Sequence, residues 1–316
     1  MRLASTFASD QDPIKRKADT MLASAWVDGA RRAVVVDDDR VGVTPIPGLD
    51  AAVRGGFDVA GAVTEWRDRC AVVLDAPLRP PVVFCLGQTY SSHVQEKEVA
   101  GHPADDHPEL PEFFLKAGQT IAAPGRPLRL GPTRITKLDY ETELGVVIGT
   151  QAHFVTAEQA LQHVFGYMVV NDLSARERQI RTAPDGTRRM AADAAKNFDG
   201  ATVFGETVVP AAHIPEPGSL AVTTHVNGEL RQSDTTGALL FSVGELIAFV
   251  SRHLTLRPGD VIATGTPGGT GWSTDSELGG TGRTPAGCAP GRYLSAGDQV
   301  LSAIERVGHA VVDVTA

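Results

Sequence analysis

Two glutamates in the middle of the chain have a spacing that favours metal binding. Glu141 and Glu143 stand two residues apart, and on a β-strand such residues point to the same face. Neighbouring carboxylates repel each other unless a cation neutralises them, and their hard oxygen atoms select Mg²⁺, Mn²⁺ or Ca²⁺ over zinc. A solvated strand face is the alternative, because most glutamates are exposed. The run from Gly145 to Gly149 reads as a buried strand, which favours the metal site because buried carboxylates need partners.

Asp172 could supply a third carboxylate. It follows two residues after the apolar run 167–170, so it would stand at the end of a buried strand, well placed to join a metal site. Its side chain could instead cap a short helix over 174–178. The residues themselves leave both interpretations open.

A second group, Tyr90, His93 and Glu96, has the composition of a base site. One helical turn would place His93 and Glu96 on the same side. A carboxylate beside an imidazole fixes its tautomer and raises its basicity, which suits a general base that acts on water. The alternative is a surface turn with a solvated histidine and glutamate.

Lys196 is a weaker candidate. A lysine near an apolar segment could bind a substrate carboxylate or a developing oxyanion, although most lysines are simply solvated.

The glycine-rich run 263–269 lacks the Gly-Lys-Ser/Thr ending of a phosphate loop, so nucleotide binding has no support. The loop 102–107 carries two histidines and two aspartates that could bind a metal, but we expect a solvated loop there.

The elements that must position these residues are mostly strands. Asn227-Gly228 predicts a hairpin over 219–232, and a second hairpin is expected over 299–314. Further strands are expected over 82–86, 113–115, 143–148, 166–170 and 203–209, with two short ones over 33–44. This order contains no alternating βαβ units, so it predicts a mixed, β-rich α+β fold and disfavours a doubly wound nucleotide-binding fold.

Helices are few. Thr156 with Gln159, and Ser242 with Glu245, have the pattern of a capping box at a helix start, and the first of these helices is expected over 156–164. Two small helices are expected over 49–54 and 58–69.

A proline-rich segment, 77–81, predicts a domain boundary because prolines lack a backbone donor. The expected units are a small N-terminal domain over 1–76 and a larger domain over 82–316. The segments 91–112 and 265–298 read as long irregular loops, which in compact domains are usually functional or disordered.

Composition narrows the class of protein. The 316 residues are 42% hydrophobic and 21% charged, enough for a substantial core, and the net charge of −9 argues against nucleic-acid or anionic-membrane partners. The three cysteines have no metal-ligand spacing: Cys70, Cys85 and Cys288. The N-terminal residues lack a signal-peptide core, and no apolar run approaches the roughly 18 residues of a membrane span. We therefore expect a soluble, cytoplasmic protein.

Taken together and in this order, several segments resemble the fumarylacetoacetate hydrolase superfamily. The matching segments are 87–96, 114–116, 139–149, 166–179, 196–199, 226–229 and 258–267. The resemblance implies a mixed β-roll catalytic domain behind a smaller N-terminal α/β domain, usually assembled as a homodimer.

The resemblance also implies roles for particular residues. Glu141, Glu143 and Asp172 match the family's metal-binding carboxylates, generally for Mg²⁺ or Mn²⁺. His93 and Glu96 match its water-activating pair, on a segment that orders over bound substrate. The positions that match substrate contacts are Tyr90, Arg176, Gln179, Thr266 and Lys196, and Lys196 is also expected to assist catalysis by its charge.

The implied reaction is hydrolysis of a carbon–carbon bond in a 1,3-dioxo or 2-oxo acid such as an acylpyruvate. Decarboxylation of oxaloacetate or isomerisation of a dioic acid on the same metal site is the alternative, and a catalytically silent binding protein is a second one. The 91–112 segment carries extra residues, and the tail after Thr266 is expanded, with Trp272, Cys288 and Tyr293. These departures leave the substrate's side chain open.

Overall fold

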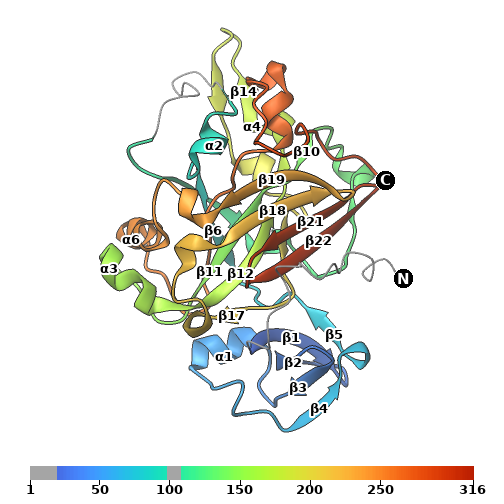
Figure 1. The fold of residues 1–316 in the computed structure, drawn as a ribbon, viewed down its shortest axis with the longest axis vertical. Helices are drawn as coiled ribbons and strands as arrows, with labels where there is room; N and C mark the ends of the chain where they lie inside the picture. The colour runs from blue at the N-terminus through green and yellow to red at the C-terminus, as the bar shows by residue number, and fades with distance from the viewer. Residues whose placement is uncertain (1–19, 98–107) are drawn as a thin grey trace.

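The computed structural model describes residues 20–97 and 108–316. The N-terminal part is a five-stranded antiparallel sheet in the order β4-β3-β2-β1-β5 (Figure 1). Its strands are β1 (Met21–Val27), β2 (Ala30–Val36), β3 (Arg40–Val43), β4 (Glu65–Asp68) and β5 (Val73–Asp75), and helix α1 (Leu49–Gly55) packs beside them. Alternate residues of β1 and β2 fill two different apolar clusters, so both faces of this sheet are covered.

The prediction of a helix over 58–69 is wrong. Its second half forms the edge strand β4, which pairs with β3 so that Arg40 lies opposite Asp68. The Arg40 guanidinium also stacks on the Trp66 ring, 5.1 Å from its centroid. Pairing across the sheet therefore outweighs the local apolar spacing.

The larger part contains an eight-stranded sheet with the main order β7-β6-β20-β11-β12-β16-β8, while β17 pairs with β12. Its strands are β6 (Val82–Gly87), β7 (Glu112–Ala117), β8 (Ile121–Ala122), β11 (Thr142–Ile148), β12 (Val164–Asp172), β16 (Thr202–Phe204), β17 (Val209–Pro210) and β20 (Val261–Ala263). The central strand β11 is buried along its whole length, as its apolar run predicts.

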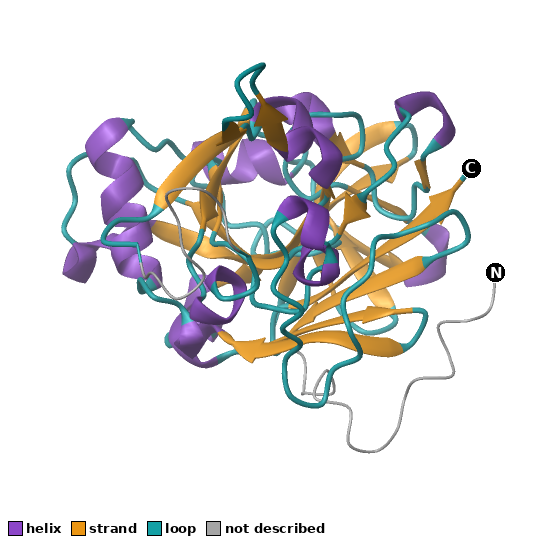
Figure 2. Cartoon of the chain, turned by 90° about the horizontal axis from the view of Figure 1, so that it is seen from above, coloured by secondary structure: helices purple, strands orange, loops and turns teal. Residues whose placement is uncertain are grey.

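A second, five-stranded sheet lies against the first in the order β19-β18-β21-β22-β9. Its strands are β9 (Leu128–Arg129), β18 (Ala221–Val226), β19 (Glu229–Thr235), β21 (Gln299–Ile304) and β22 (Gly308–Thr315). Both expected hairpins are confirmed here, and Asn227 has the positive φ of 53° that such a turn requires. One core joins the two sheets through side chains such as Leu144, Val169 and Val222. The strands curve around this shared interior (Figure 2), and the β-rich α+β class is confirmed.

The two expected capping boxes have different outcomes. Helix α6 (Val243–His253) begins with the complete box, in which Ser242 and Glu245 bond each other's backbone. Thr156 makes no such bond, and α3 (Ala157–Ala160) continues only as a 3₁₀ turn (Leu161–His163) before β12 begins. The bounds expected for this helical segment are confirmed, because its turns run to His163 and the chain enters the central sheet at Val164, but the capping box is absent.

The remaining elements are short. The helices are α2 (Ser91–Val94), α4 (Arg176–Gln179) and α5 (Asp193–Lys196), and the strands are β10 (Leu138–Asp139), β13 (Ser174–Ala175), β14 (Ile180–Thr182) and β15 (Arg188–Met190). The other 3₁₀ turns are Arg69–Ala71, Gly118–Thr120, Gly131–Thr133, Ala211–His213, Pro217–Ser219, Thr236–Ala238, Gly271–Thr274 and Ser276–Leu278. Among the described residues, no helix has the length and apolar character needed to span a membrane.

Candidate metal and catalytic centre

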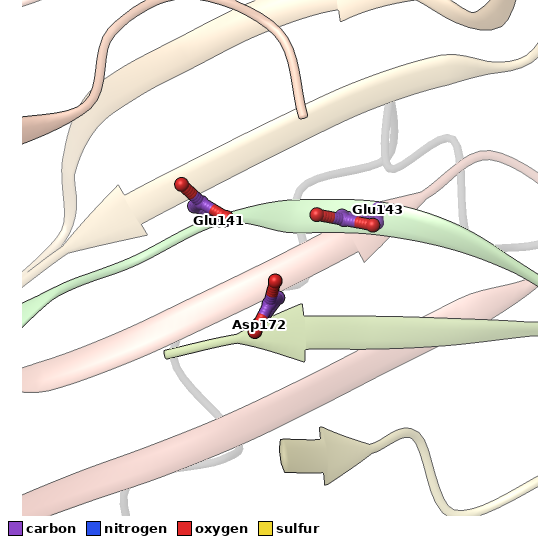
Figure 3. A group of neighbouring side chains, drawn as sticks. All are labelled: Glu141, Glu143 and Asp172. Atoms are coloured by element: carbon purple, nitrogen blue, oxygen red, sulfur yellow. The ribbon is translucent and has the colours of Figure 1, made fainter. Parts of the chain in front are cut away.

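Three carboxylates meet where β11 and β12 pair. Glu141 immediately precedes β11, Glu143 lies in it, and Asp172 ends β12 (Figure 3). The antiparallel register sets Glu143 opposite Val170, and the Asp172 N–H donates to the Glu141 carbonyl at 2.8 Å. All three side chains are buried, and one potential ligand atom from each lies within 4.8 Å of the others.

The alternative role of Asp172 as a helix cap is wrong. Helix α4 begins after Ala175, and no side chain caps it. The Asp172 carboxylate instead accepts hydrogen bonds from two buried lysines, Lys116 and Lys196. Asp172 therefore belongs to a charged cluster at the end of the strand.

Buried cations surround two of the three carboxylates. Arg176 and Lys196 both pair with Glu141, while Lys116 and Lys196 pair with Asp172. Although burial opposes the shift, the charges of Arg176 and Lys196 lower the pKa of Glu141. Glu141 is therefore held as an anion.

Glu143 has a different environment. In the part of the chain that the structure describes, no lysine or arginine forms an ion pair with it, and it accepts the backbone N–H of Gly265 at 2.8 Å. Burial, followed by the charges of Asp172 and Glu141, raises its pKa. A buried carboxylate beside two like charges needs a cation. Three convergent carboxylates fit a hard divalent ion such as Mg²⁺ or Mn²⁺.

His93 and Glu96 form a buried dyad, as one helical turn predicts. His93 Nδ1 lies 3.0 Å from Glu96 Oε2, and both residues are at most 5% exposed. Burial, followed by the charge of Lys97, lowers the pKa of His93 well below its usual value. The imidazole is therefore uncharged at neutral pH, and with Nδ1–H donated to Glu96, the lone pair is on Nε2, which faces Lys97 Nζ.

The glycine-rich segment after β20 holds Glu96 in place. Gly269 N–H donates to Oε1, and the Thr270 hydroxyl donates to Oε2 at 2.9 Å. Burial raises the pKa of Glu96 to about 8, and these two donors oppose that rise. The charges of Glu141, Arg176 and Lys196 also act on His93, so the dyad lies in the same electrostatic environment as the carboxylates.

The residues expected to contact substrate make different contacts in the structure. Arg176 and Gln179 are buried neighbours, with Arg176 Nη1 donating to Gln179 Oε1 at 2.8 Å. Tyr90 is buried at the start of α2, and burial raises its pKa. The Thr266 hydroxyl donates to the Thr142 carbonyl at 3.0 Å and accepts from Gln232, so it is engaged by the backbone of β11.

Sequence reasoning missed three residues of this centre. Asp139 accepts hydrogen bonds from Arg176 Nε at 2.7 Å and from the backbone of Gly271 and Trp272. The Trp272 ring contacts both Arg176 and Lys97, at 4.8 and 4.7 Å from its centroid. Lys97 Nζ lies 3.3 Å from His93 Nε2, and its position four residues after His93 is the signal that could have found it. The loop residues 102–107 lie outside the described part of the chain.

Comparisons with known proteins give one consistent result. A family model, fumarylacetoacetate (FAA) hydrolase C-terminal, matches residues 82–315. The oxaloacetate tautomerase YisK of Bacillus subtilis is 36% identical over 239 residues, which is 75% of this chain and 71% of that protein. The homoprotocatechuate catabolism bifunctional isomerase/decarboxylase of Escherichia coli is 42% identical over 187 residues, 59% of this chain but only 41% of that protein.

Solved structures agree with the fold. A fumarylacetoacetate hydrolase from Exiguobacterium antarcticum has a TM-score of 0.73 and 33% identity, covering 94% of this chain and 99% of that one. The fumarylpyruvate hydrolase from Pseudomonas aeruginosa, solved with Mn²⁺ and pyruvate, has a TM-score of 0.60 and 29% identity, covering 76% of this chain and 90% of that one.

Proposed function

The chain belongs to the fumarylacetoacetate hydrolase family, and we propose that it is a divalent-metal-dependent hydrolase that cleaves a carbon–carbon bond in an acylpyruvate-like 1,3-dioxo acid. The membership confirms the resemblance and the β-roll fold expected from it. The particular reaction rests on the His93–Glu96 dyad, with its 3.0 Å contact beside the carboxylates.

The dyad has the properties of a general base for water. His93 is uncharged because its pKa is lowered, and Glu96 fixes the ring from the Nδ1 side. His93 Nε2 would take a proton from water, and the resulting hydroxide would attack the carbonyl farther from the 2-oxo acid. The adjacent carbon–carbon bond would then break, releasing a carboxylic acid and leaving the enolate of the 2-oxo acid, which would take up a proton to become the 2-oxo acid product. A simple decarboxylation does not need an activated water molecule. The presence of a base that can deprotonate water therefore favours hydrolysis.

Glu141, Glu143 and Asp172 would hold Mg²⁺ or Mn²⁺. A divalent ion there would supply Lewis-acid stabilisation of the negative charge that develops on a 2-oxo acid. The relative solved with Mn²⁺ and pyruvate supports this choice of ion class and ligand class.

Lys196 pairs with two of the three carboxylates, Glu141 and Asp172. Burial opposes the shift, but the charges of Asp172 and Glu141 raise its pKa, so the ammonium persists throughout the neutral range. A fixed positive charge in a buried site stabilises a developing enolate. Arg176 and Gln179 would orient the acid from the α4 side.

Oxaloacetate tautomerisation or decarboxylation is a second candidate function. The match to the oxaloacetate tautomerase from Bacillus subtilis covers three quarters of this chain, and the Escherichia coli isomerase/decarboxylase is 42% identical over 187 residues. The same base could remove a proton from the carbon next to the oxo group without a water molecule. A catalytically silent protein is disfavoured because all three carboxylates and the dyad are present.

Product analysis by NMR separates these reactions. The protein, supplied with Mg²⁺ or Mn²⁺, is given an acylpyruvate and oxaloacetate in parallel. Pyruvate and a free carboxylic acid from the acylpyruvate are expected. Turnover of oxaloacetate alone would replace the hydrolase by the second candidate. The expected homodimer and cytoplasmic location stay predictions.

A further inference from the structure

Lys97 is a buried cation that the proposed reaction does not use. Lys97 is 8% exposed, and within residues 20–97 and 108–316 no carboxylate forms an ion pair with its ammonium group. Its described polar contact is His93 Nε2, at 3.3 Å. Buried lysines are normally paired, so this arrangement is costly unless the cation meets a further partner.

The protein holds the Lys97 ammonium at a defined place. The ammonium lies over the indole of Trp272, 4.7 Å from the ring centroid. Trp272 is itself fixed, because its backbone N–H donates to Asp139 and its ring N–H donates to the Leu278 carbonyl. The backbone of Lys97 is also bridged to Gly280. A long side chain that is clamped at both ends loses little further entropy on binding a ligand.

The position of Lys97 affects the base. An ammonium that donates to His93 Nε2 occupies the lone pair that should accept a proton. A carboxylate is a better partner for an ammonium than an imidazole is, so an incoming anion would draw the lysine away. Burial and the charge of Arg176 lower the pKa of Lys97 to about 8, so its charged form is disfavoured. A bound anion would stabilise the charged form.

We propose that Lys97 binds a second carboxylate of the substrate, at the end of the carbon chain away from the 2-oxo acid, and that this pairing frees His93 Nε2. The inference rests on the proposed function and narrows its substrate class to dianionic 2-oxo acids. Lys97 Nζ lies 3.3 Å from His93 Nε2, so a second carboxylate beyond the carbonyl that faces His93 would be within reach of the ammonium.

The test compares two 2,4-dioxo acids of equal chain length, one ending in a carboxylate and one in a methyl group. Lys97→Met keeps the length of the side chain and removes its charge, while Lys97→Arg keeps the charge. Loss of a charged hydrogen bond predicts that Lys97→Met lowers kcat/KM for the carboxylate-ended acid by roughly 10- to 100-fold. The methyl-ended acid should react at the same rate or faster, because the ammonium no longer occupies Nε2. Lys97→Arg should retain preference for the carboxylate.

A second readout does not depend on cleavage. Titration calorimetry of the Mn²⁺-loaded protein with 2-oxoglutarate and 2-oxopentanoate compares ligands that differ in the distal carboxylate. We expect tighter binding of 2-oxoglutarate by the parent protein and loss of that preference in Lys97→Met. If neither dioxo acid is cleaved while this preference is seen, the hydrolase proposal fails and the anion site stands.

Other outcomes overturn the inference. An equal loss for both dioxo acids in Lys97→Met would show that the lysine only positions His93. Equal binding of the two calorimetric ligands by the parent protein would exclude a distal anion site, even if Lys97→Met does not fold.

Discussion

Glu143 is the carboxylate whose surroundings call most directly for a bound cation. Its two neighbours have lysine or arginine partners, whereas Glu143 has a single backbone donor among the described residues. Removing its charge should therefore relieve repulsion in the metal-free protein and weaken the metal site at the same time. Stability with and without metal separates these two effects.

For Glu143→Gln, we expect the Mn²⁺-dependent rise in melting temperature to be lost. In the parent protein, Mn²⁺ at about 100 times its Kd would stabilise the fold by roughly 2.7 kcal/mol. Thermal melts with Mn²⁺ and with a chelator measure this difference. Exposed Glu216→Gln is the matched control and should keep the full rise. An unchanged rise in Glu143→Gln would remove this residue from the metal site.

His93→Gln tests the base. Loss of a general base is expected to reduce kcat by about 10²- to 10⁴-fold. Among the described residues, the His93 side chain contacts Glu96 and Lys97 and forms no hydrogen bond or ion pair with Glu141, Glu143 or Asp172. The Mn²⁺-dependent rise in melting temperature should therefore be retained. His309→Gln, at an exposed position of β22, is the control. Cleavage at the parent rate would assign the base to another residue.

The pKa of Lys97, about 8, predicts a pH dependence. A lysine is charged below its pKa, so the anion-binding ammonium should be present below pH 8 and lost above it. The other charged groups that act on Lys97 are Glu96, Glu141, Arg176 and Lys196, and His93 is its direct contact. These groups remain in Lys97→Met, so the ratio of parent to variant kcat/KM reports chiefly on Lys97.

For the carboxylate-ended acid, this ratio should fall by about tenfold per pH unit above pH 8, following the protonated fraction. Lys97→Arg should show no such fall because arginine stays protonated. Steady-state kinetics from pH 6.5 to 9.5 measure both. A ratio that stays constant over this range would contradict a charged role for Lys97.

At the scale of elements, α2 depends on a distant loop. A four-residue helix is not stable by itself, and here the loop that follows β20 bonds it repeatedly. Gly268 N–H donates to Ser92, Thr270 donates to Glu96, and Thr281 N–H donates to the Glu96 carbonyl at 2.9 Å. The loop therefore holds the residues of the dyad in place.

Thr270→Val tests this dependence. Loss of one donor to a buried carboxylate should lower kcat by roughly tenfold and raise the pKa of Glu96 above about 8. Since ionised Glu96 makes His93 more basic, the rise of kcat/KM with pH should move to higher pH. The methyl-ended acid is used in the Lys97→Met background, because Lys97 titrates in the same range and contacts His93 Nε2. Thr270→Ser keeps the hydroxyl and should retain the parent profile, and an unshifted profile in Thr270→Val would contradict the link.

Local patterns predicted the parts of the site that local geometry creates. The two-residue spacing of Glu141 and Glu143 and the one-turn spacing of His93 and Glu96 both follow from strand and helix periodicity. The contact between Asp139 and Trp272 was missed because it joins residues more than 100 positions apart. The two capping boxes illustrate the same limit of local patterns. The box at Ser242 starts a full helix, whereas Thr156 forms no cap bond and the short helix after it is followed by a central strand.

At the scale of the whole molecule, one apolar cluster crosses the predicted domain boundary. Leu22 and Leu49 of the N-terminal part share it with Val147 and Val170 of β11 and β12. Val147 lies on the same face of β11 as Glu143, since residues two and four apart on a strand share a face. Two of the metal-site carboxylates, Glu143 and Asp172, thus lie on one face of β11 and β12. The N-terminal sheet covers the other end of this face.

Polar contacts strengthen this junction. Asp75, which ends β5, accepts from Arg31 Nε at 2.9 Å and from Arg79 just before β6. Asp50 of α1 accepts the Arg79 backbone N–H at 2.6 Å. Because an apolar cluster crosses the boundary and these polar contacts tie the segment 77–81 to the N-terminal part, the two predicted domains are expected to unfold together.

Tryptophan fluorescence can test this coupling, because the three tryptophans lie in different parts. Trp26 and Trp66 lie on β1 and β4, and Trp272 lies beside the candidate site. Trp272→Phe reports on the N-terminal sheet, and the double variant Trp26→Phe/Trp66→Phe reports on the site. We expect each variant to give the same unfolding midpoint by fluorescence as by circular dichroism, with and without Mn²⁺. The contrary result is that Mn²⁺ shifts the unfolding midpoint reported by Trp272 and leaves the midpoint reported by the N-terminal tryptophans unchanged. That result would show that the two parts unfold independently and that the shared cluster contributes little to their joint stability.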